Sequence, residues 1–309
     1  MTEATFDTTC SAQFEEPLAG TAKAAGLFLA LEHSLGWSHD ILDGGVWGAD
    51  ISAQVKKWLK ERGAALQLIR KPGRLGQIKC AGVSLYIAHA QPTEPNGVFM
   101  EHLTVASVEE MLSLDIQLGQ TTPGARRVDH PLYLVCTHGK RDRCCAIKGR
   151  PMAQAMYNLF PDVVWETSHS KGHRFAPATV LLPWNYSYGR LSAVQTKELI
   201  ESIHRGQLYA PGCRGRGIYS PQGQVAELAV RTQTQSWGIA DIDEVVELAG
   251  AATVPRYLVT LSDASDQPGA QYEVALERII TEDVVSSCGE APGPKKGWVA
   301  QSVTRRPMR

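Results

Sequence analysis

The 309-residue sequence has almost no net charge and no long hydrophobic run. It has 31 Lys and Arg against 32 Asp and Glu, a formal net charge of −1, which argues against binding to nucleic acid or to a membrane surface. No window reaches the roughly 18 apolar residues that a membrane-spanning helix needs. The N-terminal region is acidic and polar and has no apolar segment, so we expect no signal peptide.

The cysteine pattern excludes two further classes of protein. Seven cysteines are an odd number, unlike the paired framework of small secreted domains, so we expect a reducing compartment and a cytoplasmic location. No Cys-x-x-Cys pair is present, which argues against an ordinary dithiol redox motif. Glycine spacing of the Walker or Rossmann type is also missing, which argues against a nucleotide site.

Two potential thiolate ligands lie between Pro131 and Pro183. Cys136 follows the apolar run PLYLV, which predicts a buried strand, and Cys145 precedes a predicted helix with Pro151 in its first turn. A helix N-terminus and nearby cations lower the pKa of a thiol and favour the thiolate, which is the form that binds metals. Five basic residues surround Cys145: Lys140, Arg141, Arg143, Lys148 and Arg150.

Two histidines complete a possible ligand set. His169 and His173 follow a second predicted strand, DVVWE, and residues four apart share one face of a helix or tight turn. Gly172 between them permits close approach of the backbone to a bulky cofactor. Two thiolates with two imidazoles suit either tetrahedral zinc or an iron–sulfur cluster. The triplet Cys136-Thr137-His138 is similar to the first box of a Rieske site, but no second box of the form Cys-x-x-His follows, so a Rieske site is excluded and His138 is interpreted as a loop residue.

Other interpretations of the same residues remain open. A buried cysteine is often only a small hydrophobic side chain. The chain could also be a thiol oxidoreductase, with Cys144–Cys145 or Cys136 reactive, or a structural zinc protein. Because Cys144 adjoins Cys145, the second thiolate could be either residue.

The segments CTHGKRDRCC and SHSKGHRFAPATVLLP, with spacing C-x8-C followed by H-x3-H, resemble the thioredoxin-like ferredoxins of the sucrase/ferredoxin-like family over roughly residues 129–206. The resemblance implies a [2Fe–2S] cluster with bis-histidinyl, non-Rieske ligation by Cys136, Cys145, His169 and His173. The shared Arg141-Asp142 favours Cys145 over Cys144 as the second thiolate.

The resemblance also implies an electron carrier or redox component rather than a stand-alone enzyme. Histidine ligands predict a pH-dependent potential, because an imidazole that reaches solvent can take up a proton when the iron is reduced. The basic loop around Cys145 could dock a redox partner with an acidic surface. The identity of that partner and the oligomeric state are left open.

The order of predicted elements indicates an α/β protein in three parts. Residues 129–215 run strand, helix, strand, ligand turn, strand, strand, helix, a thioredoxin-like arrangement. Residues 1–128 repeat this order without ligands, with a helix over 51–63 and a second helix opened by a Ser107–Glu110 capping box. Residues 216–309 are expected to form a helical connector, including a short helix in DIDEVVELAG, and a small antiparallel β appendage.

The remaining thiols and arginines are given structural interpretations. The loop YAPGCRGRGIYSPQGQ is interpreted as a plain connection, although Arg214 or Arg216 could bind an anion. The other cysteines are interpreted as free or packing thiols, namely Cys10, Cys80, Cys213 and Cys288.

Overall fold

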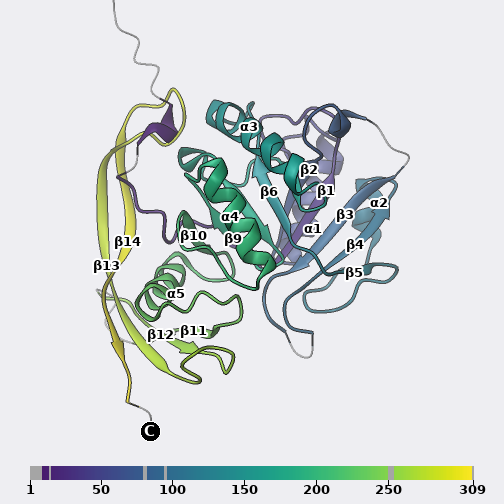
Figure 1. Ribbon diagram of the computed structural model, residues 1–309. Coiled ribbons are helices and arrows are strands. Elements are labelled where there is room, and N and C mark those ends of the chain that lie inside the picture. Colours follow the sequence, from purple (N-terminus) through teal and green to yellow (C-terminus); the bar gives the residue numbers. More distant parts are fainter. Residues whose placement is uncertain (1–8, 14, 79–81, 94–95, 250–253, 308–309) are drawn as a thin grey trace, which may run out of the picture.

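The computed structural model describes residues 9–13, 15–78, 82–93, 96–249 and 254–307. In these ranges the chain is a mixed α/β protein with one sheet of ten strands and another of four. The four-stranded sheet stands beside the larger one, with α5 (Pro221–Thr234) near both (Figure 1). Within the described ranges, no helix combines the length and apolar character needed to cross a bilayer. Cys80 lies outside the described residues.

The ten-stranded sheet is built from two halves with the same order of elements. The first half contains β1 (Leu27–Glu32), α1 (Ala49–Glu61), β2 (Ala64–Arg70), β3 (Val83–His89), β4 (Phe99–Val105), α2 (Val108–Ser113) and β5 (Arg126–Val128). The second half contains β6 (Leu132–Cys136), α3 (Arg143–Leu159), β7 (Val164–Thr167), β8 (Thr179–Leu182), β9 (Tyr186–Tyr188), α4 (Ala193–His204) and β10 (Cys213–Arg216). Short 3-10 turns occur at η1 (Cys10–Ala12), η2 (Leu75–Gln77) and η3 (His173–Phe175).

Strand pairing repeats as well. The strand order is β10-β9-β8-β6-β7-β2-β1-β3-β4-β5. In each half the first two strands are parallel, and the third strand pairs antiparallel with the first. The halves join where β2 pairs antiparallel with β7, so that Arg70 lies opposite Glu166 and forms an ion pair with it at 2.8 Å. The repeated element order expected from the sequence is therefore visible in the sheet.

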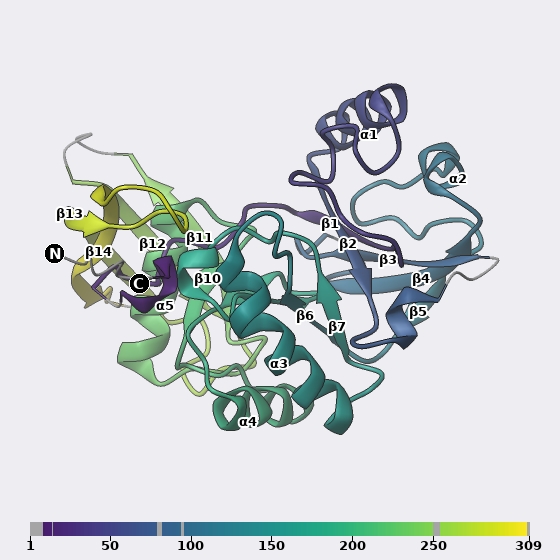
Figure 2. The ribbon, with the colours of Figure 1, turned by 90° about the horizontal axis from the view of Figure 1, so that it is seen from above.

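Successive side chains of each strand point to opposite faces of the sheet, and this alternation decides which side chains pack against the helices and which pack between the two halves. Leu29 of β1 faces α1 and α2, and Val135 of β6 faces α3 and α4. Their sequence neighbours point the other way, and Phe28, Leu134 and Trp165 share a third core between the halves. Burial of each such side chain stabilises the fold by about 1.5–3 kcal/mol. The N-terminal half thus covers the inner face of the second half, and the two helix pairs lie on different sides of the molecule (Figure 2).

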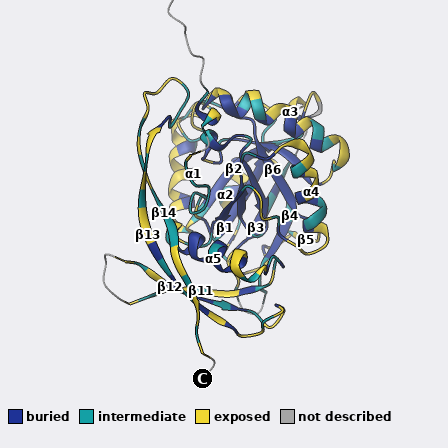
Figure 3. Cartoon of the chain, turned by 60° about the vertical axis from the view of Figure 1, so that its left-hand side comes forward, coloured by how far each residue is buried: buried dark blue, intermediate teal, exposed yellow. Residues whose placement is uncertain are grey.

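The C-terminal residues form an antiparallel meander, as expected. Its strands are β11 (Ile242–Leu248), β12 (Arg256–Leu261), β13 (Gln271–Val284) and β14 (Gly293–Arg305). Val230 of α5 packs on this sheet, whereas Leu228 packs on the core of the larger sheet. The strands of the larger sheet are largely buried, while β13 and β14 are partly exposed (Figure 3).

Three details differ from the expectation. Asp142 accepts a hydrogen bond from the Cys144 N–H and starts α3 at Arg143, so Pro151 lies inside the helix and Cys145 in its first turn. Proline cannot donate to the carbonyl four residues earlier, at Ile147, whose exposed position allows water to do so. Ile242–Leu248, within the segment where a short helix was expected, forms β11, because pairing with β12 outweighs local propensity. The loop expected after residue 208 contains β10, which extends the large sheet.

Candidate metal centre

The carboxyl end of β6, the start of α3 and the turn after β7 meet at one place. Cys136 is the last residue of β6, and Cys145 lies in the first turn of α3. His169 follows β7, and His173 begins η3. Parallel pairing of β6 with β7 aligns Cys136 with Thr167, so both strands end on the same side of the sheet.

Three of the four expected ligands converge closely. One ligand atom each of Cys136, Cys145 and His169 lies within 4.8 Å of the others. His173 is not part of that tight group, but its ring centroid is 5.1 Å from that of His169. Both cysteines are about 99% buried, each with 1% of its surface exposed. These residues are close enough to bind a metal ion.

The hydrogen bonds of His173 identify its free ring nitrogen. Nε2 lies 2.6 Å from the carbonyl oxygen of Ser286. Because a carbonyl oxygen only accepts, Nε2 carries the proton, and Nδ1 of the neutral ring has a free lone pair. Nδ1 is buried and has no hydrogen-bond partner among the described residues. Histidines that ligate metals commonly donate their other ring N–H in this way.

His138, which was interpreted from the sequence as a loop residue, holds the turn that carries His169. Its Nε2 lies 2.6 Å from the Ser38 carbonyl oxygen, so Nδ1 is unprotonated and accepts the His169 backbone N–H at 3.1 Å. Trp37 packs edge-on against the His138 ring at 5.6 Å between centroids. The loop of the first half therefore positions a ligand of the second. Nδ1 of His169 is also buried without a partner in the described part of the chain.

Two glycines allow close packing behind the ligands. A Cβ at Gly149 of α3 would lie 2.0 Å from the Cys136 carbonyl oxygen, so only glycine lets the helix lie this close to the end of β6. Gly172 has a φ of +92°, and a Cβ there would lie 2.5 Å from the Arg214 guanidinium. Arg214 is buried, donates to the Lys171 carbonyl oxygen at 3.2 Å and braces the histidine turn. Arg214 therefore makes structural hydrogen bonds within the chain, whereas close approach of a cofactor at Gly172 stays a prediction.

The two thiols share a proton. A hydrogen bond from the Cys145 thiol, aided by His169, outweighs burial and lowers the pKa of Cys136 well below its usual range. The same hydrogen bond, together with burial, raises the pKa of Cys145. Burial lowers the pKa of His173 below its usual value, with Asp142 opposing the shift. A thiolate and a neutral imidazole are the protonation states that bind a metal.

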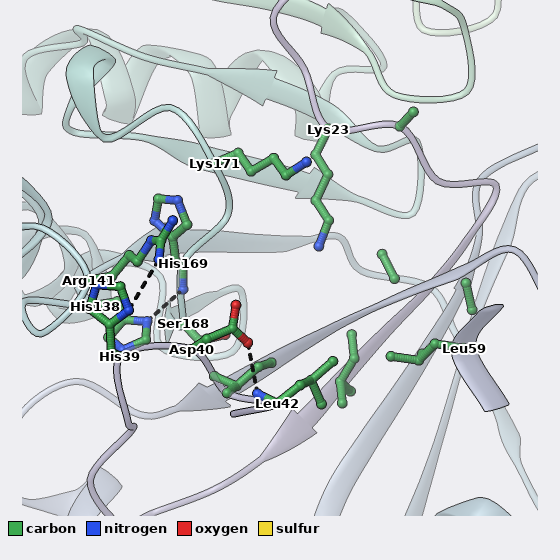
Figure 4. Close-up of a pocket in the computed structure, with 15 residues that line it drawn as sticks. Lys23, His39, Asp40, Leu42, Leu59, His138, Arg141, Ser168, His169 and Lys171 are labelled. Carbon is green, nitrogen blue, oxygen red and sulfur yellow. Dashed lines mark hydrogen bonds between the residues drawn. The ribbon is translucent and has the colours of Figure 1, made fainter. Parts of the chain in front are cut away.

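A pocket of about 300 Å³ opens beside His169. Lys23, Arg141 and Lys171 line it together with His169 and the single acid Asp40 (Figure 4). This side of the centre is therefore positively charged.

The other cysteines divide into two groups. Cys213, the first residue of β10, is buried in the core of the second half as a packing residue. Cys10, interpreted from the sequence as a free terminal thiol, is instead buried against Cys144 and Cys288. Hydrogen bonds from Cys10 and Ser11 outweigh burial and lower the pKa of Cys144 to about 5. The adjacency of Cys144 and Cys145 was the only hint of this in the sequence.

The fold and the site together define a mixed α/β protein with a cysteine–histidine centre that can hold a metal ion. The model of the sucrase/ferredoxin-like family matches residues 18–215, more than half of the chain, and the chain belongs to that family. The matched region spans the large sheet from β1 almost to the end of β10 and leaves out the four-stranded sheet. Searches of curated proteins and of solved structures gave no match.

Proposed function

We propose that this protein transfers electrons through a [2Fe–2S] cluster held by Cys136, Cys145, His169 and His173. The observation that carries the proposal is the convergence of two buried thiols and one imidazole within 4.8 Å, with a second imidazole next to them. When bound, such a cluster accepts and releases one electron at a potential that imidazole ligands raise from roughly −400 mV toward roughly −150 to +300 mV.

The residues present fit this group. The Nδ1 atoms of His169 and His173 are buried polar atoms with no partner in the described ranges, a costly arrangement unless a ligand completes it. Ser286 holds the His173 ring in the tautomer with Nδ1 free. The proton shared by Cys136 and Cys145 leaves when both sulfurs bind a metal.

The basic pocket beside His169 favours an electron carrier that docks a partner protein. We propose that each half of the large sheet is a thioredoxin-like unit, because both share one element order and one pairing pattern. The basic pocket lined by Lys23, Arg141 and Lys171 reaches His169 directly. We propose that a redox partner with an acidic surface docks there, so that electron transfer to it slows as salt concentration rises.

Anaerobic purification with iron and sulfide analysis tests the cluster. We expect red-brown protein that contains iron and acid-labile sulfide, and both should be lost in Cys136→Ser and Cys145→Ser. Cys213→Ser is the matched control, since this buried cysteine lies apart from the site and should leave the iron content unchanged. Colourless protein with zinc on Cys136 and Cys145 would instead establish a structural zinc site, and a colourless metal-free protein a dithiol.

Separate substitutions test the two histidine ligands and the choice between Cys144 and Cys145 as the second thiolate. His169→Cys and His173→Cys should keep a cluster with a lower potential, because thiolate replaces neutral imidazole. Cys144→Ser should keep the iron that Cys145→Ser loses; the reverse result would show that Cys144 is the second thiolate ligand.

Proton coupling predicts a reduction potential that falls as the pH rises. Because Ser286 holds the Nε2 proton of His173, we expect the solvent-facing His169 to dominate this dependence.

A further inference from the structure

A second cluster of sulfur atoms lies at the first turn of α3 and is separate from the group that contains Cys145. Cys10 comes from η1, Cys144 from the first turn of α3, and Cys288 from the connection between β13 and β14. Their sulfur atoms are 3.5 Å apart between Cys10 and Cys144, 3.1 Å between Cys144 and Cys288, and 3.6 Å between Cys288 and Cys10. Three segments separated by more than 130 residues thus bring three thiols together.

A carboxylate completes the group. Oδ1 of Asp142 lies 3.7 Å from the Cys10 sulfur and 3.2 Å from the Cys288 sulfur. The Cys144 and Cys288 backbone N–H groups both donate to Asp142, each at 2.9 Å, and hold its carboxylate in place. One ligand atom from each of the four residues lies within 4.8 Å of all the others.

The spacing of the four atoms matches the corners of a small tetrahedron. With zinc–sulfur bonds of about 2.3 Å, tetrahedral geometry places the sulfur atoms roughly 3.8 Å apart. With a zinc–oxygen bond of about 2.1 Å, a sulfur and an oxygen corner lie roughly 3.6 Å apart. The three sulfur–sulfur separations are about 0.2–0.7 Å shorter than the tetrahedral value. Of the two sulfur–oxygen separations, the one to Cys288 is about 0.4 Å shorter and the one to Cys10 about 0.1 Å longer, so the thiols would move apart by a few tenths of an ångström around an ion. A disulfide would instead require about 2.05 Å between two sulfur atoms.

We propose that Cys10, Cys144, Cys288 and Asp142 bind a single structural zinc ion. Zinc binds both thiolate sulfur and carboxylate oxygen in four-coordinate sites, so three cysteines and one aspartate are suitable ligands. Four protein ligands leave no coordination position open for a substrate, as is typical of structural zinc sites. Cys10, Cys144 and Asp142 are at most 5% exposed, so little water reaches the site. Binding displaces the thiol protons and creates no redox change, so no further reactant is needed.

The ion would join parts of the chain that the sheet alone does not connect. It fastens the N-terminal segment and the β13–β14 connection to the start of α3. Gln13 reinforces the same contact through the Asp283 carbonyl oxygen and the Val285 N–H, at 2.8 and 2.9 Å. The assignment uses none of the four expected cluster ligands, so it stands or falls independently of the iron–sulfur proposal.

Metal analysis of the purified full-length protein tests the site. After desalting, we expect about one zinc ion per chain, and zinc-edge X-ray absorption should show three sulfur neighbours at about 2.3 Å and one oxygen at about 2.1 Å. Cys10→Ser and Cys288→Ser should each lower the bound zinc several-fold while the iron content is unchanged. Cys213→Ser is the control that should retain the zinc. Hydrogen exchange in Cys288→Ser should accelerate around residues 9–13 and 284–290.

Several results would overturn the zinc site. Protein without zinc, zinc retained in both cysteine variants, or zinc lost only with Cys136 and Cys145 would each do so. So would a disulfide between any two of Cys10, Cys144 and Cys288, detected by mass spectrometry of the unreduced protein. If a cysteine variant fails to fold, the X-ray absorption of the unaltered protein still decides the ligand set. The iron content is measured on the same samples, so failure of the cluster proposal is seen separately.

Discussion

Replacing Arg231 by methionine should destabilise the whole fold, because its charge balances a carboxylate in the core. Arg231 and Glu227, one turn apart on α5, are both 0% exposed and form an ion pair at 3.0 Å. The same guanidinium donates to the Tyr186 hydroxyl at 3.1 Å and to the carbonyl oxygens of Ser236 and Gly238 at 2.8 and 2.9 Å. It therefore ties α5 to β9 and to the turn that follows α5.

The magnitude follows from the unpaired charge that remains. Methionine fills most of the arginine volume, so the main effect of the substitution is that Glu227 loses its ion-pair partner. Removing one partner of a buried ion pair lowers the free energy of unfolding by about 3–5 kcal/mol. At roughly 2–4 °C per kcal/mol for a chain of this size, the melting temperature should fall by at least about 6 °C. Adding Glu227→Gln removes the buried charge and should recover more than about 1 kcal/mol.

Thermal unfolding followed by circular dichroism measures the effect. Arg256→Met is the matched control, because Arg256 is also paired with a glutamate, Glu273, but its side chain is 58% exposed. Exposed pairs contribute about 0–1 kcal/mol, so this control should change the melting temperature little. Equal losses in Arg231→Met and Arg256→Met would refute the reasoning, as would a failure of Glu227→Gln to compensate.

Two further predictions concern the first half and the ligand helix. Burial lowers the pKa of His89, and its Nδ1 accepts the Gly119 N–H at 3.0 Å. As the pH falls below about 6.5, the histidine of the unfolded chain therefore takes up a proton before the folded one does, and the free energy of unfolding decreases. His89→Phe should flatten the fall in melting temperature between about pH 7.5 and about pH 5.5, and an unchanged slope would contradict this. Gly149→Ala should push α3 from β6 and lower the iron content severalfold, whereas Gly36→Ala, with open space around it, should not. Equal iron in both glycine variants would show that the close approach is not needed.

Local signals in the sequence were sufficient for much of the fold. Cys136 at the end of an apolar run and the histidines flanking Gly172 are features of short segments, and the structure brings Cys136, Cys145 and His169 together. The order of elements in both halves was predicted for the same reason, since hydrophobic period and caps are local. The predicted Ser107 N-cap is present, with the serine hydroxyl accepting the Glu110 N–H, but the Glu110 carboxylate accepts from the Ala106 N–H instead of completing the capping box at Ser107.

Contacts between distant segments could not be predicted in this way. Cys288 is 278 residues from Cys10 along the chain, and no local pattern marks their approach. The strand β11 has a sequence rich in acidic residues and owes its conformation to pairing with β12. Arg214 was placed in a plain connecting loop, with anion binding as the alternative, but it lies in a strand that buries it, and burial lowers its pKa to about 9. In each case the partner that decides the structure lies in another element.

Asp142 contacts both groups of ligands, the thiols of the proposed zinc site and His173 of the proposed cluster site. It starts α3, and the consecutive cysteines that follow point to different groups, with Cys144 among the second thiols and Cys145 beside Cys136. Its Oδ2 lies 3.7 Å from Nε2 of His173, the ring that Ser286 holds two residues before Cys288. The β13–β14 connection therefore contacts both the Asp142 carboxylate and the His173 ring. The four-stranded sheet, although outside the matched family region, thus reaches the surroundings of the proposed cluster through this connection.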